Sequence, residues 1–148
     1  MPYHNIEATL TPTDQQLIFD QLNTIRTKLP FLINLTSKEK RMGRLTHNKP
    51  AFRHIALESA QLRPELLPPA QPLEAWAKDE NLLTTLQPIL QEINLLKEAL
   101  EDTVLALRME SHSASKNFLN FARISAGTNV PGIDAIVKRM EEALNGKG

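Results

Sequence analysis

The chain has 148 residues, no cysteine, and 17 basic against 17 acidic side chains. The missing cysteines exclude disulfides, thiolate metal sites and a cysteine nucleophile, and the balanced charge disfavours attraction of the whole protein to nucleic acid or to an anionic membrane. No stretch approaches the roughly 20 apolar residues of a membrane span, and the first ten residues lack a signal-peptide pattern. These features predict one cytoplasmic domain over residues 1–148, with an arm at 1–10 and a frayed tail at 145–148.

Helix start and stop signals begin directly after the arm. Thr11 is suited to cap a helix, whose apolar residues recur every three or four positions until Pro30 ends it. Thr36 and Glu39 then form a capping-box pattern, in which each side chain can bond the other residue's backbone N–H. We expect this box to open a short extra helix near 37–42.

A further helix is expected from Pro50 to Pro64, followed by a proline-rich segment over 64–72. We interpret that segment as a connector held down by Leu66 and Leu67, with a proline-rich recognition segment as the less favoured alternative. The predicted inner face of the helix consists of Phe52, Ile55, Ala56, Ser59 and Leu62.

From Pro72 onward the pattern predicts helix over a long stretch. Pro88 either kinks this helix or begins a new one. Beyond it, apolar and small residues recur every three or four positions without loss of phase, although the serines at 109–115 leave open whether the helix breaks and turns back there. The members of this series are Ile89, Ile93, Leu96, Leu100, Val104, Leu107, Ser111, Ala114, Phe118, Phe121 and Ser125. A last helix follows Val130.

The expected fold is therefore all-α: a four-helix-type bundle with one long helix in the second half and a short extra helix near 37–42. Several motifs, in order and spacing from residue 10 to 140, resemble a family of small bacterial helical-bundle proteins of unknown function. These are Lys28–Leu32, Leu35-Thr36, Arg41-Met42-Gly43, Pro64–Pro69, Leu86-Gln87-Pro88, Glu101-Asp102-Thr103 and Val130-Pro131-Gly132. The resemblance implies a bundle but no activity, cofactor or site residue. The basic segment 44–49 departs from the family's pattern, which puts a family-wide role for it in doubt.

Motifs for metal binding and catalysis are weak. The Glu-x-x-His pattern of carboxylate di-metal bundles is absent, and His54 with Glu58 is more typical of a surface pair. His112 lies between two serines, but neighbours on a helix point about 100° apart, so no nucleophile and base face each other. We assign no catalytic residue, no metal ligand and no cofactor.

Two surface hypotheses and one core hypothesis remain. The first and favoured is a non-enzymatic module that acts through a protein partner or as a homo-oligomer. The second is a small-molecule or metal site in the bundle core, for which the candidates are Glu98, Asp102, His112 and Lys116. The third is contact with an anion or nucleic acid, which the net charge makes unlikely for the whole protein. Its candidates are Lys38, Lys40, Arg41, Arg44, Lys49 and Arg53.

Overall fold

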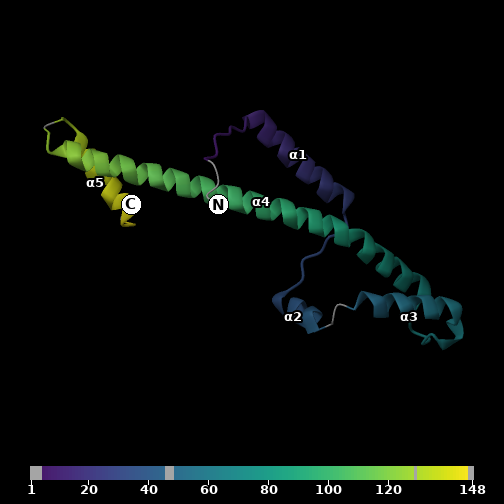
Figure 1. The fold of residues 1–148 in the computed structure, drawn as a ribbon. Coiled ribbons are helices and arrows are strands. Elements are labelled where there is room, and N and C mark those ends of the chain that lie inside the picture. Colours follow the sequence, from purple (N-terminus) through teal and green to yellow (C-terminus); the bar gives the residue numbers. More distant parts are fainter. Residues whose placement is uncertain (1–4, 46–48, 129, 147–148) are drawn as a thin grey trace. The chain divides into compact units, whose positions relative to one another are not determined.

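The computed structural model describes residues 5–45, 49–128 and 130–146. Within these ranges the chain is helical, and no strand occurs (Figure 1). The elements in order are α1 (Pro12–Lys28), α2 (Ser37–Leu45), α3 (Pro50–Leu62), the 3-10 helix η1 (Pro64–Leu66), α4 (Leu73–Ala126) and α5 (Ile133–Leu144). The predicted all-α fold is confirmed, as are the long helix in the second half and the short helix near 37–42.

Both predicted capping motifs form. The backbone N–H of Asp14 donates to the Thr11 hydroxyl at 3.1 Å, which caps α1. At α2 the box is reciprocal: the Thr36 N–H donates to a Glu39 carboxylate oxygen at 2.7 Å, and the Glu39 N–H donates to the Thr36 hydroxyl at 3.3 Å. The hydrogen bonds from Thr36, first from its hydroxyl and then from its backbone, hold the pKa of Glu39 below its ordinary value.

The open question at 109–115 resolves to continuity, because α4 is one helix of 54 residues that also passes through Pro88. Among the serines that could have capped a break there, Ser115 bonds within the helix instead. Ser115 donates to the carbonyl of Ser111 at 2.7 Å, and Thr103 donates to the carbonyl of Ala99 at the same distance. Hydroxyls satisfied in this way leave the helical backbone uninterrupted.

The chain forms two compact units, which we describe separately: the N-terminal unit, Ala8–Ile93, and the C-terminal unit, Asn94–Gly148 together with Met1–Glu7. A single domain over residues 1–148 stays a prediction.

In the N-terminal unit, α3 lies antiparallel to the start of α4. Arg53 and Glu80 form an ion pair with Nε and Oε2 3.1 Å apart, and Ala56 and Ala60 line a common cavity with Trp76. The half-buried residues of α3 are Arg53, Ala56, Leu57 and Ala60, and those of the facing turns of α4 are Leu73, Trp76, Ala77 and Glu80. Both sets follow the spacing of one helix face.

The predicted inner face of α3 is therefore wrong in its large side chains. Phe52, Ile55 and Leu62 are 71%, 60% and 74% exposed. The inward face is rotated: Arg53 pairs with Glu80 of α4, and the half-buried Ala56 and Ala60 follow it on the same side of α3.

In the C-terminal unit, α5 folds back along the end of α4 (Figure 1). Gly132 precedes α5 with φ 85°, a left-handed conformation that favours glycine. Leu119 of α4, 4% exposed, is the one buried hydrophobic side chain among the described residues, and it lines a cavity with Met140 and Leu144. Arg123 and Glu141 are joined by an ion pair of 2.8 Å.

Candidate functional site

One exposed face of α4 dominates the C-terminal unit. We call it the α4 stripe and define it as Leu96, Leu100, Val104, Leu107, Ser111, Ala114, Phe118 and Phe121. Steps of three or four residues keep the stripe on one side of the helix. All its members are exposed, and Leu96, Leu100 and Phe121 are 67%, 62% and 74% exposed. The side chains predicted to face a bundle core are thus uncovered within this unit.

The stripe runs beside a shallow cavity of about 340 Å³. Leu100 and Val104 of the stripe line it together with Leu105, and the charged side chains of Glu101 and Arg108 lie at its edge. Glu101 also forms an exposed ion pair of 3.1 Å with Lys97, one helical turn earlier. Exposed pairs of this kind contribute little stability, so Glu101 can exchange partners at small cost.

The four candidate ligand-binding residues are only partly brought together. His112 and Lys116 line the cavity of about 220 Å³ between α4 and α5. Asp102 lies ten residues before His112, about 15 Å away along the helix axis, and Glu98 lies a further turn away. All four are exposed, and no polar side chain is buried in the described part of the chain. A shared ligand site for this set stays a prediction.

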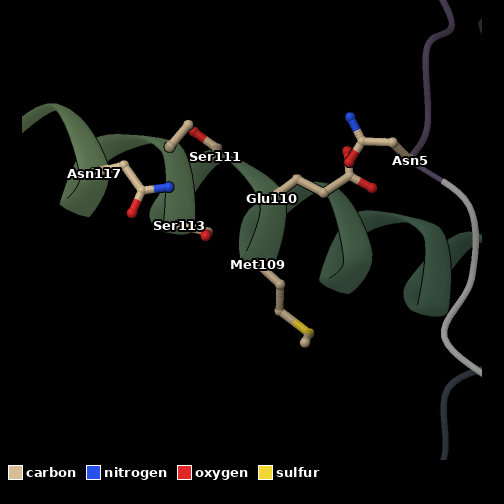
Figure 2. A pocket seen from close by; sticks show the side chains of 7 residues that line it. Asn5, Met109, Glu110, Ser111, Ser113 and Asn117 are labelled. Atoms are coloured by element: carbon tan, nitrogen blue, oxygen red, sulfur yellow. The ribbon is translucent and has the colours of Figure 1, made fainter.

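The arm contacts α4 at a position that the sequence did not suggest. The backbone N–H of Ile6 donates to the half-buried carboxylate of Glu110 at 3.1 Å. Figure 2 shows the Asn5 and Glu110 side chains close together at the edge of an open cavity of about 640 Å³, with Ser113 and Asn117 further along the helix. Glu110 thus anchors the arm, and no local pattern could have shown this, because the two residues are 104 positions apart.

The six candidate anion-contact residues lie on α2 and around the start of α3, and a shared anion site for them stays a prediction. Lys38, Lys40, Arg41 and Arg44 are exposed on α2, and Lys49 is exposed just before α3. Arg53 is half-buried in its ion pair with Glu80. Residues 46–48, which include His47 and belong to the basic departure from the family pattern, lie outside the described residues.

Three further features bear on other kinds of site. In the described ranges, no three His, Asp or Glu side chains are placed to hold a metal ion. A contact from Arg63 holds the pKa of the exposed Glu65 below its ordinary value. Across the same ranges, no helix combines the length and the apolar character needed to cross a membrane.

Comparison with protein families, with characterised proteins and with solved structures gives no match for this chain. The family resemblance drawn from the motifs accordingly stays a prediction, and the case for function depends on the chain's own geometry.

Proposed function

We propose that this protein is a non-enzymatic helical interaction module, which acts by burying the α4 stripe against another polypeptide. The observation that carries the proposal is the stripe itself: large apolar side chains lie in a row on one face of α4 and remain exposed. Contiguous apolar patches larger than a few hundred Å² are rare on monomers and mark interaction sites.

The ligand-binding alternative has weaker support. Small-molecule sites enclose most of the ligand and converge a few polar groups on it. The cavity lined by His112 and Lys116 is small, and both side chains are exposed. A cytoplasmic location and a bacterial origin stay predictions.

A pair of matched variants tests the proposal. Leu100→Glu places a carboxylate in the stripe, whereas Leu95→Glu makes the same change about 140° around the helix. Leucine and glutamate have similar helix propensities, so α4 is retained in both variants. We expect the Tm of the wild type and of Leu95→Glu to rise with protein concentration, as it does for associating chains. In Leu100→Glu the association should weaken by at least about tenfold, because an unpaired charge would be buried.

The proposal fails if the wild-type Tm is independent of protein concentration and a thermal-shift screen against metals, nucleotides and metabolites shows a reproducible stabilisation. That result would move attention to the candidate ligand residues. Equal behaviour of the two variants would also contradict a role for the stripe.

A further inference from the structure

We infer that the α4 stripe is covered by the same stripe of a second copy of this chain, with the two helices antiparallel and the twofold axis passing between Val104 and Leu107. This inference depends on the proposed function and adds the identity, orientation and register of the partner. An isologous contact of this kind is the commonest arrangement in homodimers.

The sizes of the stripe side chains select the orientation. Around the proposed axis, Val104 lies opposite Leu107 of the second copy, Leu100 opposite Ser111, and Leu96 opposite Ala114. Leu96 and Leu100 thus each meet a small residue, which keeps the separation of the helices uniform between residues 96 and 114. The contact is confined to this part of the stripe, because the register would place Phe118 opposite Ile93, which lines a cavity with α1. A parallel pair in register would place Ser111 on Ser111 and Ala114 on Ala114, with leucine on leucine in the preceding layers. That arrangement leaves voids at one end and crowding at the other.

The charges beside the stripe agree with the same register. Arg108 and Glu101 are seven residues apart and therefore lie on the same flank of the stripe. In the antiparallel pair this flank meets the same flank of the second copy, so Arg108 lies beside Glu101 of that copy. The symmetry repeats this contact, and the interface gains two ion pairs of opposite charge. In the parallel pair this flank would meet the other flank of the second copy, where Arg108 would lie beside the neutral Thr103. Charge complementarity of this kind contributes more to orientation than to affinity.

Helix α5 leaves the stripe free for this contact, and Ser111 and Ala114 of the stripe border the open cavity beside Asn5 of the arm. Leu119 is buried by α5, whereas its neighbour Phe118 is 58% exposed, so α5 and the stripe occupy different sides of α4. Each copy contributes one α4 segment and one α5. The paired copies then hold four helices, two from each copy.

Cysteine crosslinking tests the orientation directly, because the natural chain has no cysteine. We would prepare Leu96→Cys and Ala114→Cys, with a purification tag on one of them, and oxidise them mildly, alone and mixed. The antiparallel register places residue 96 beside residue 114 of the second copy. The two copies of residue 96 are then about 27 Å apart along the axis, far beyond disulfide range. The expected dominant product is the mixed disulfide, with little crosslinking of either variant alone.

Leu95→Cys, on a different face of the same turn, is the control for random collisions and should not crosslink. A dimer in which each variant links efficiently to itself would overturn the antiparallel register and leave the proposed function standing. Sedimentation velocity of the reduced variants separates the remaining case: chains that are monomeric at every concentration, and do not crosslink, would overturn the inference and remove self-association from the proposed function.

Discussion

The two halves of α4 carry the same apolar periodicity but differ in what meets it. In the N-terminal unit, Ile25 and Leu29 of α1 line an apolar cavity of about 370 Å³ together with Ile89 and Ile93 of α4. There Ile89 and Ile93 are 39% and 43% exposed. In the C-terminal unit the next members of the series, Leu96 and Leu100, are 67% and 62% exposed, and the following Val104 and Leu107 are 46% and 42% exposed.

The difference shows why helical periodicity alone does not locate a core. A repeat every three or four residues specifies which face of a helix is apolar, but not whether the same chain supplies the element that covers it. Where α1 lies across the series, the chain provides the cover. Where the C-terminal unit offers none, a partner is the natural source.

The largest predicted effect on stability comes from the one buried side chain. Leu119→Ala should lower the free energy of unfolding of the α4–α5 hairpin by about 2–4 kcal/mol, through lost burial and the cavity left behind. Thermal unfolding followed by circular dichroism measures this change. Ile124→Ala, at a position 73% exposed, is the matched control and should have a small effect. Equal losses in the two variants would contradict the assignment of Leu119 as the centre of the hairpin.

A smaller effect is expected where α1 meets the first half of α4. Leu29 is half-buried, so Leu29→Ala should destabilise the packing of α1 against α4 by about 1–2 kcal/mol. This is less than the loss expected when a fully buried leucine is truncated. Amide hydrogen exchange of α1 should accelerate. Leu17, which is 53% exposed on the same helix, serves as the comparison, and Leu17→Ala should leave the exchange nearly unchanged. If Leu29→Ala changes nothing, α1 does not cover this half of α4.

The ion pairs of the two hairpins should differ in strength. The Arg53 and Glu80 side chains are 28% and 14% exposed, whereas those of Arg123 and Glu141 are 47% and 41% exposed. Removing the less solvated charge by Glu80→Gln should cost about 1 kcal/mol, and Glu141→Gln a few tenths. Fluorescence of Trp76, the single tryptophan, follows the first variant, and circular dichroism follows the second. The reverse order would show that solvent exposure does not decide the contribution of these pairs.

The smallest effect concerns pH at α2. Because the folded-state pKa of Glu39 is lowered, its capping contribution is fully present above the ordinary glutamate pKa and is lost as the pH falls through the lowered folded value. We expect NMR chemical shifts of residues 37–40 to lose helical character on acidification. In Thr36→Ala, which removes the hydroxyl, the first turn should be less helical at neutral pH and should depend less on pH. An unchanged pH response in that variant would contradict the box as the cause.

Local signals in the sequence predicted much of the fold. Thr11, Thr36 and Glu39 form the predicted caps, because capping depends on residues only three positions apart. The phase of the apolar series also favoured a continuous α4, and the back-bonded hydroxyls remove the objection to it. The face of α3 was mispredicted because the partner of Arg53 is Glu80, 27 residues later, and no local pattern pairs them.

The candidate site was less predictable for the same reason. The residues of the α4 stripe were identified correctly as one face, but their exposure depends on which elements of the chain reach them. Glu110 as the anchor of the arm also required the three-dimensional structure.

Sedimentation equilibrium of the wild-type chain over a range of concentrations tests the central claim most directly. If the α4 stripe is covered by a second copy, the mass should approach twice 16.7 kDa as the concentration rises. A mass of 16.7 kDa at every concentration would contradict the account and would require the chain to cover its own stripe or to leave it bare.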